Sequence, residues 1–300
     1  MNLLNINDDV NNALLSVEKV LETNFKWDFK SSILKEATFH LLSVKGKLLR
    51  PGLVFIGAEA IGSVVEEYID LATAIEYLHI SSLIHDDIID KDDKRRGKET
   101  VHIKYGIENA ILAGDALIAR AVSLSAKYGE RVVSKISGTA FQMCDGEALD
   151  YSVQEGKVKQ DFNGYLEVAR RKTASLISTS LSIASIRENK EDNIVRKLEN
   201  AGENLGIAFQ IRDDIINAVG SVELGRRPGM DDATKNRPNI VSVILSENGK
   251  KKESIETAIT LMEDYVGQAI SKLSDFPRID VLKQYINAYF NPEILRNYLY

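Results

Sequence analysis

The sequence predicts an all-α protein, and three observations support this prediction. The 300 residues include only five prolines, none of them between residues 52 and 227, so long helices can run there without a break. Apolar residues recur at three- and four-residue intervals, as in Leu71, Ile75 and Leu78, which is the spacing of one helix face. The alternation of apolar and polar residues that is typical of strands is scarce. We therefore expect long helices in a single domain, residues 1–300.

The expected helices follow one another along the chain, with limits marked by glycine, proline or polar clusters. Pro51 suits the first turn of the third helix. A longer loop of glycines, prolines and mixed charges is expected at residues 220–239. The helices are expected at residues 9–23, 29–43, 51–62, 67–90, 106–128, 131–154, 158–188, 192–219, 239–247, 253–272 and 277–290.

The composition limits the class of protein. Hydrophobic residues make up 44% of the chain, which is ample for a large buried core. The formal net charge of -6 argues against a general nucleic-acid partner. The single cysteine, Cys144, excludes an internal disulfide, and we expect it to be a small buried residue in a reducing compartment. The N-terminus lacks the features of a signal peptide, and no apolar run approaches about 18 residues, so we expect a cytoplasmic protein without a transmembrane segment.

An acidic cluster, Asp86, Asp87 and Asp90, ends the apolar run of residues 67–90. At about 100° per residue, Asp86 and Asp90 lie on one helix face, together with His79. Two carboxylates at this spacing repel each other by roughly 0.2–0.5 kcal/mol, whereas a divalent cation would bind both. Mg²⁺ is the expected ion because it takes oxygen ligands from one or two carboxylates and from phosphates. The alternative is a solvated helix end that runs into a charged loop.

Three basic segments are candidates for binding phosphate groups. They comprise Lys47 with Arg50, Arg95 with Arg96, and Lys172 with Thr173. The first lies where a helix begins, and helix N-termini attract anions. In the second, the arginine forks match phosphate oxygens, and Gly97 could let the backbone approach a ligand closely. For each segment the alternative is an ordinary solvated surface charge.

A second polar stripe is expected on the helix at residues 192–219. Gln210, Asp213, Asp214 and Asn217 are three or four residues apart, which places all four on one helix face. This stripe could face the first acid pair. Two acidic faces with cations between them would bind a diphosphate, whose charge neither face could accept without the metal.

The order of these motifs resembles that of the trans-isoprenyl diphosphate synthases. Four segments carry the resemblance between about residues 45 and 240, namely GKLLRP, HISSLIHDDIIDKDDKRRG, RRKTASL and FQIRDDIIN. The resemblance implies an all-α bundle around a deep central cavity, usually as a homodimer. It also implies a Mg²⁺-dependent condensation of isopentenyl diphosphate with an allylic diphosphate, with three Mg²⁺ ions when both substrates are bound.

The resemblance also assigns roles to individual residues. Those expected to bind Mg²⁺ are Asp86, Asp90 and Asp213. Those expected to bind isopentenyl diphosphate are Lys47, Arg50, His79 and Arg96. Those expected to bind the allylic diphosphate are Arg95, Lys172, Thr173 and Gln210, with Arg226 as a further cation. The metal ligands and Lys172 are the expected catalytic residues, because charge on the departing diphosphate must be stabilised for the allylic C–O bond to ionise.

The sequence departs from the family pattern in three places. The second acid motif usually ends in aspartate, but here it ends in Asn217. Asparagine is neutral and is a weaker ligand for the metal. Arg226 stands where the family has a lysine, and residues 234–237 do not align clearly with a later one. The segment Asp145-Gly146-Glu147 with Asp150 only approximates a polar motif of the family, and it receives no role.

Residues before the first acid cluster are expected to set the length of the product. In the family, bulky aromatic residues four and five positions before the first aspartate stop growth early, and here those positions are Ser82 and Ser81. Small side chains predict a linear all-trans product of C20 or longer. Leu78, one turn deeper, is expected to close part of the bottom of the product cavity. Alternatively, the serines only pack between helices and another helix sets the floor.

Two other functions stay open. A terpene cyclase shares the helical fold and an aspartate-rich motif, but it handles one diphosphate, whereas the separate basic segments predict two. A non-catalytic partner subunit of a prenyl diphosphate synthase is the second alternative. Such a subunit is expected to have lost the first acid pair, which this chain keeps.

Overall fold

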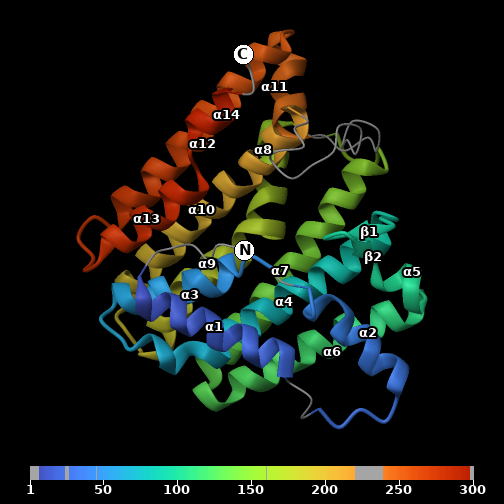
Figure 1. Cartoon of the computed structure of the whole chain (residues 1–300). Coiled ribbons are helices and arrows are strands. Elements are labelled where there is room, and N and C mark those ends of the chain that lie inside the picture. Colours follow the sequence, from blue (N-terminus) through green and yellow to red (C-terminus); the bar gives the residue numbers. More distant parts are fainter. Residues whose placement is uncertain (1–6, 24–26, 45, 160, 220–238, 298–300) are drawn as a thin grey trace. The chain divides into compact units, whose positions relative to one another are not determined.

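The structure, a computed structural model, describes residues 7–23, 27–44, 46–159, 161–219 and 239–297, and these residues are almost entirely helical (Figure 1). The all-α prediction is confirmed. The α-helices are α1 Asp8–Thr23, α2 Ser32–Leu42, α3 Leu49–Ala60, α4 Ile69–Ile89, α5 Val101–Tyr105, α6 Ile107–Ser125, α7 Glu130–Gln154, α8 Phe162–Val168, α9 Ser175–Arg187, α10 Asp192–Val219, α11 Ile240–Asn248, α12 Lys251–Lys272, α13 Ile279–Tyr289 and α14 Pro292–Asn297. Single-turn helices of the 3-10 type are Val65–Tyr68 and Ala126–Tyr128, and Ala169–Ala174 is a π-helix, here called the π segment. The strands are β1 Lys94–Arg95 and β2 Lys98–Glu99.

Backbone contacts divide the chain into two compact units. The first comprises Met1–Ala140 and Ser180–Glu191, and the second comprises Phe141–Thr179 and Asp192–Tyr300. The boundary falls inside α7 and again inside α9. The single domain and the face-to-face placement of the two acidic stripes stay predictions.

The first unit is built around α4. All residues from Leu71 to Leu78 are buried, so this helix has no solvent-facing stripe in its first half. A helix that is buried on every side belongs to the core of its unit, and α4 packs against α1, α3 and α6 (Figure 1). After Asp70, half-buried positions recur only from His79 onward, toward its C-terminal end. The packing of α4 therefore fixes the position of the acidic cluster that ends it.

The second unit is built around α10, which packs against α12 and against the π segment. Glycines let the backbones come close. A Cβ atom added at Gly206 of α10 would lie 2.3 Å from the Cα atom of Ala174. A Cβ atom added at Gly146 of α7 would lie 2.3 Å from the backbone nitrogen of Lys172. Both glycines thus allow helices to contact the π segment directly. π-Helical turns are rare in proteins, and those that occur are often at functional sites.

The structure differs from the sequence expectations in local details. Residues 94–99, for which no regular element was predicted, contain the antiparallel pair β1–β2. Arg96 and Gly97 make its turn with φ angles of 50° and 80°, and two positive φ values are typical of the two-residue turns that suit a β-hairpin. The helix expected at 158–188 begins only at Phe162 and contains the π segment. The predicted loop at 220–239 lies, except for its last residue, outside the described residues.

Cys144 contradicts its prediction, because it is exposed on α7. The buried residue of this turn is Gly146, which lies about 200° around the helix from Cys144. Within the described part of the chain, no helix has both the length and the hydropathy to cross a membrane.

Candidate active site

The three acids at the end of α4 have different surroundings. Asp87 is buried, and its Oδ1 atom accepts a hydrogen bond of 2.5 Å from Nε of Arg95 in the hairpin. Asp86 and Asp90 are half-buried, and the backbone N–H of Asp90 donates to the carbonyl of Asp86 at 2.8 Å. The structure therefore separates a structural acid, Asp87, from a pair of acids one turn apart.

The position of Asp86 and Asp90 favours a cation. The backbone carbonyls at a helix C-terminus carry partial negative charge, so carboxylates are unfavourable there. Among the described residues, no group of three or more histidine, cysteine, aspartate or glutamate side chains is arranged to hold a metal. Two carboxylates fit Mg²⁺, which is commonly held by one or two acids and completes its shell with water and phosphate oxygens. The residues present therefore suit Mg²⁺ bound together with a phosphate ligand.

Arg50 and His79 form a direct pair in the first unit. Nη1 of Arg50, from the first turn of α3, lies 3.2 Å from Nε2 of His79 on α4. A guanidinium group can only donate hydrogen bonds, so Nε2 of His79 accepts and the ring proton is on Nδ1. Burial lowers the pKa of His79 well below its ordinary value, and the charges of Arg50, Arg96 and Arg95 lower it further. His79 is thus neutral at pH 7.

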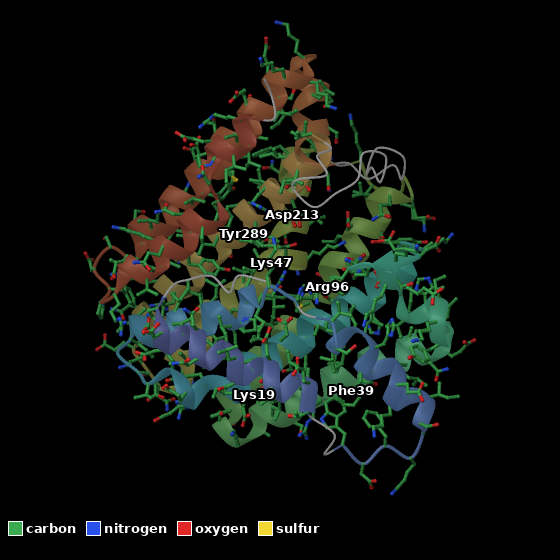
Figure 2. All side chains as sticks on the ribbon, in the orientation of Figure 1. Lys19, Phe39, Lys47, Arg96, Asp213 and Tyr289 are labelled. Atoms are coloured by element: carbon green, nitrogen blue, oxygen red, sulfur yellow. The ribbon has the colours of Figure 1, made fainter. Side chains whose placement is uncertain are left out.

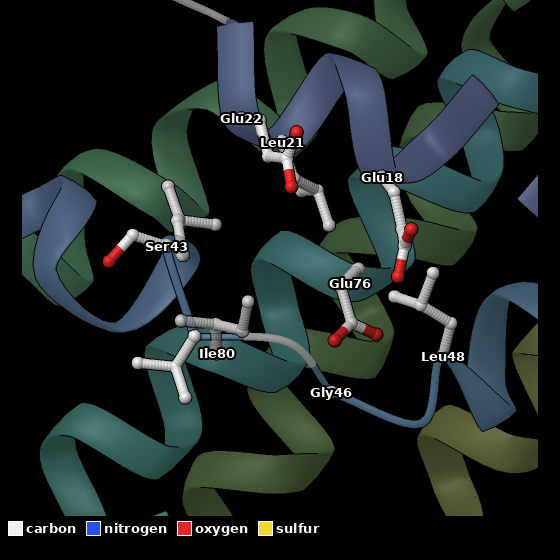
Figure 3. Close-up of a pocket in the computed structure, with 10 residues that line it drawn as sticks. Glu18, Leu21, Glu22, Ser43, Gly46, Leu48, Glu76 and Ile80 are labelled. Carbon is white, nitrogen blue, oxygen red and sulfur yellow. The ribbon is translucent and has the colours of Figure 1, made fainter. Parts of the chain in front are cut away.

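Glu76 is an acid that the sequence interpretation overlooked. It is buried on α4 one turn before His79 and extends toward the loop that carries Gly46 and Leu48 (Figure 3). Burial raises its pKa, while the positive charges of Arg50 and Arg96 act in the opposite direction. Glu76 therefore places a buried carboxyl group within electrostatic reach of Arg50 and Arg96, which are expected to bind a diphosphate.

A small pocket lies beside Glu76, lined also by Glu18 and Glu22 of α1 (Figure 3). The loop that borders it is closely fitted to the hairpin. Nη1 of Arg96 donates to the carbonyl of Val44 at 3.2 Å, and a Cβ atom at Gly46 would lie 3.0 Å from this Nη1 atom. A glycine at position 46 thus leaves room for the guanidinium of Arg96.

The remaining predicted residues of the first unit lie along α4 and in the loop before α3. Lys47 is exposed in that loop and is labelled, like Arg96, in Figure 2. Leu78 and Ser81 are buried, and Ser82 is half-buried and donates to the carbonyl of His79 at 2.9 Å. The positions expected to control product length thus lie one to two turns before Asp86 on the central helix of this unit.

The second unit contains a continuous hydrogen-bond chain from the π segment to α11. The hydroxyl of Thr173 donates to Oε1 of Gln210 at 2.7 Å, and Nε2 of Gln210 donates to Oδ1 of Asp214 at 3.0 Å. Oδ2 of Asp214 accepts from the backbone N–H of Ile240 at the start of α11. Asp214 is buried and has a structural role. Gln210 and Thr173, whose diphosphate-binding role stays a prediction, are hydrogen-bonded to each other.

Asp213 differs from its neighbour Asp214. Its side chain is 33% exposed, and its Oδ1 atom lies 3.2 Å from Nη1 of Arg212. The guanidinium of Arg212 lies 4.4 Å from the centre of the Tyr289 ring, and that ring stacks on Phe209 with 5.2 Å between ring centres. Asp213 and Tyr289 are labelled in Figure 2. The half-buried carboxylate suits a metal ligand, and this role of Asp213 stays a prediction. Tyr289 of α13 packs against the neighbouring Arg212.

Lys172 lies in the π segment between two acids of α7. Its Nζ atom is 2.5 Å from Oε2 of Glu147 and 2.7 Å from Oδ2 of Asp150. The neighbouring Arg171 pairs instead with Asp145 at 2.6 Å and with Glu167 at 2.6 Å. The structure thus gives partners to the acids for which the sequence suggested no role. Arg226 lies outside the described residues.

Comparisons with known proteins decide the family. The sequence pattern of the family described as Polyprenyl synthetase matches residues 31–273. The chain belongs to the polyprenyl synthetase family. It is 34% identical over 282 residues to the geranylgeranyl pyrophosphate synthase of Geoglobus acetivorans, covering 89% of this chain and 88% of the relative. It is 32% identical over 275 residues to heptaprenyl diphosphate synthase component 2 of Geobacillus stearothermophilus, covering 90% of this chain and 83% of the relative.

A solved structure agrees with this assignment. The geranylgeranyl pyrophosphate synthetase from Geoglobus acetivorans superposes with a TM-score of 0.81 at 29% identity, and the match covers 96% of both chains. Membership of the polyprenyl synthetase family confirms the predicted resemblance and the assignment as a trans-prenyltransferase. The roles of individual residues stay predictions.

The sequence contained a signal for one of the overlooked residues. Glu76 is a charged residue three positions before His79 in an otherwise apolar run, and such a residue needs a buried partner. The sequence gives no comparable signal for the contact of Glu147 and Asp150 with Lys172. Asp150 and Lys172 are 22 residues apart, and only the packing of α7 on the π segment joins them.

Proposed function

We propose that this polyprenyl synthetase condenses isopentenyl diphosphate with an allylic prenyl diphosphate to make a linear all-trans product of C20 or longer. The observation that carries the proposal is the arrangement at the end of α4. Two carboxylates one turn apart, Asp86 and Asp90, follow a neutral His79 that is hydrogen-bonded to Arg50. Carboxylates for Mg²⁺ at the end of α4, with donors for phosphate on α4 and on the neighbouring α3, suit a metal-diphosphate substrate.

The residues divide into two sets in this proposal. Lys47, Arg50, His79 and Arg96 of the first unit hold the diphosphate of isopentenyl diphosphate. Arg95, Lys172, Thr173 and Gln210 hold the allylic diphosphate, with Arg226 as an additional cation. Asp86, Asp90 and Asp213 hold Mg²⁺, three ions in all when both substrates are bound.

The chemistry follows from these roles. Held by Asp86, Asp90 and Asp213, Mg²⁺ would supply positive charge that stabilises the departing diphosphate. Lys172 and Arg95 donate hydrogen bonds to its oxygens, which lowers the barrier to ionisation of the allylic C–O bond. Arg50 and His79 hold isopentenyl diphosphate so that its double bond captures the cation. His79 is neutral, so its Nδ1–H can donate a hydrogen bond without adding a charge. Loss of a proton to the released diphosphate completes one five-carbon extension.

The proposed product length rests on α4. Ser81 and Ser82 precede Asp86 by five and four residues and place no large side chain there. The two relatives are named for geranylgeranyl and heptaprenyl products, which correspond to C20 and C35 chains. Both support a product of at least C20. A homodimer and a cytoplasmic location complete the proposal, on the family resemblance.

A single incubation tests the reaction. Purified protein with Mg²⁺ and isopentenyl diphosphate is given C5, C10, C15 or C20 allylic diphosphates in separate samples, and the products are resolved by chain length. Linear all-trans products of C20 or longer, lost when EDTA removes the metal, are the expected result. A cyclic hydrocarbon from one allylic substrate alone would instead identify a terpene cyclase.

A partner subunit is the second candidate, and two observations favour keeping it. One relative is named as a component of a heptaprenyl diphosphate synthase, and Asn217 weakens the second acid motif. If the purified chain extends no starter although it binds Mg²⁺ and inorganic diphosphate, the partner subunit replaces the enzyme as the best interpretation.

A further inference from the structure

The ammonium group of Lys172 is enclosed by acids in a way that the proposed reaction does not require. Glu147 and Asp150 lie one turn apart on α7, and both carboxylates are within hydrogen-bond distance of Nζ. The exposed fractions of the three side chains are 23% for Lys172, 13% for Glu147 and 16% for Asp150. The three groups are therefore largely shielded from water, and their interactions are less screened than those of surface ion pairs.

The backbone around Lys172 is also closely fitted. Gly146, the residue before Glu147, contacts the peptide that joins Arg171 to Lys172 so closely that a Cβ atom would overlap it. The π segment is also closely packed against α10, where Gly206 contacts Ala174 equally closely. A lysine side chain on a flexible four-carbon stem otherwise samples many rotamers. Here the fixed backbone and two carboxylates restrict its position.

The charges of this cluster do not suit a free anion. One ammonium and two carboxylates sum to a net charge of about −1. A diphosphate without metal would therefore gain little from Lys172, because the neighbouring acids oppose it at short range. A diphosphate that carries Mg²⁺ brings positive charge to the same acids, and the opposition decreases.

We propose that Glu147 and Asp150 are positioning residues that hold and neutralise Lys172, so that this lysine favours a diphosphate only when metal ions accompany it. The inference rests on the proposed function insofar as that function makes Lys172 a diphosphate ligand. It goes beyond that function by assigning the acids of α7 a role in selecting the metal-bound form of the substrate.

Calorimetric titration of the full chain with inorganic diphosphate tests the proposal, with EDTA in one series and Mg²⁺ in the other. Glu147→Gln and Asp150→Asn keep the shape of each side chain and remove one negative charge. Without metal, both variants are expected to bind diphosphate roughly threefold or more tightly than the original chain, since one opposing charge has gone. With Mg²⁺ the gain should be much smaller.

Asp145→Asn is the matched control. Asp145 belongs to the same helix and pairs with Arg171 of the same π segment, but this pair is more exposed. The control should leave the metal-free affinity at its original value. Thermal melts followed by circular dichroism identify any variant that fails to fold, and either acid alone can then carry the test.

Two results would overturn the proposal. The first is an unchanged metal-free affinity in both folded variants. The second is a tenfold loss of diphosphate affinity confined to the Mg²⁺ series, which would make Glu147 or Asp150 a metal ligand instead. Failure of the proposed function has a different signature, because the original chain would then extend no allylic substrate even if the affinities changed as expected.

Discussion

Asp86, Asp87 and Asp90 are close in sequence, yet their environments assign them different roles. Asp87 is buried against Arg95 and holds the β1–β2 hairpin to α4. Asp86 and Asp90 lie one turn apart where the carbonyl end of the helix adds negative charge. The sequence showed the spacing of all three acids, but it could not show which of them forms the ion pair with Arg95.

Replacement of either metal-binding candidate should separate activity from stability. Asp86→Asn or Asp90→Asn is expected to lower turnover about a hundredfold or more, since the metal supplies several kcal/mol of transition-state stabilisation. The fold should be unchanged or more stable by roughly 0.2–0.5 kcal/mol, because a repulsion one turn apart has gone. Steady-state assays and urea unfolding measure the two effects. Asp93→Asn, at an exposed position after the helix, is the control and should keep both values.

His79 predicts a dependence of stability on pH. Its folded-state pKa is lowered by burial and by Arg50, Arg96 and Arg95, so the unfolded chain binds a proton more readily than the folded chain. The contribution of His79 to the free energy of unfolding is therefore fully present above its unfolded pKa of about 6.5. It is lost progressively as the pH falls below that value toward the lower folded pKa.

The variant His79→Gln keeps a polar side chain at this position without the titration. Urea unfolding between pH 7.5 and 5 should show a shallower decrease of stability on acidification than in the original chain. Glu76 has a raised pKa, and its contribution changes in the opposite direction, so the comparison must be between the two proteins at each pH. Identical slopes would show that His79 is not the group responsible.

At the scale of elements, the helices were predictable and the irregular turns were not. Proline spacing and apolar periodicity act over many residues, which is why α1, α4, α7 and α10 begin and end close to their expected limits. The β1–β2 hairpin has two residues in each strand, too few for an alternating pattern. The π segment likewise leaves no periodic signal, because one inserted residue shifts the helix face without ending the helix.

The fit of α7 and α10 on the π segment should appear in the stability of glycine variants. Gly146→Ala and Gly206→Ala each place a Cβ atom within 2.3 Å of a backbone or Cα atom, so we expect a loss of about 1–3 kcal/mol from overpacking. Gly138→Ala is the matched control on α7, since no atom lies within 4 Å of the added Cβ atom.

The control should change stability in the opposite direction. Alanine is favoured over glycine within a helix by up to about 1 kcal/mol, so Gly138→Ala is expected to raise the urea midpoint. Equal effects at Gly138 and Gly146 would mean that helix propensity decides the outcome, and the close approach of α7 to the π segment would then be wrong.

At the scale of the whole molecule, family and reaction class could be predicted because four motifs keep their order over most of the chain. The residues that complete each site were harder to predict. Glu76 acts on Arg50 and Arg96 through the packing of α3, α4 and the hairpin, and Glu147 reaches Lys172 only because α7 packs on the π segment. Such pairs depend on tertiary contacts between distant segments, and no local pattern in the sequence records them.

Product length is a property of the whole enzyme that a single position on α4 can test. Ser82 is half-buried and makes one hydrogen bond to the carbonyl of His79, so a larger side chain has more room there than at the buried Ser81. Ser82→Phe is expected to shift the main product from C20 or longer to C15, because an aromatic ring blocks the growing chain one turn before Asp86. Chromatography of the dephosphorylated products measures the shift.

Ser82→Ala is the control for this test. It removes the hydrogen bond, at a cost of about 0.5–1.5 kcal/mol, but adds no volume, so the product length should stay the same. If folded and active Ser82→Phe still makes the original product, Ser82 only packs between helices and another helix sets the floor. If both variants shorten the product, the hydrogen bond to His79 and the position of isopentenyl diphosphate control chain growth, rather than the size of the side chain.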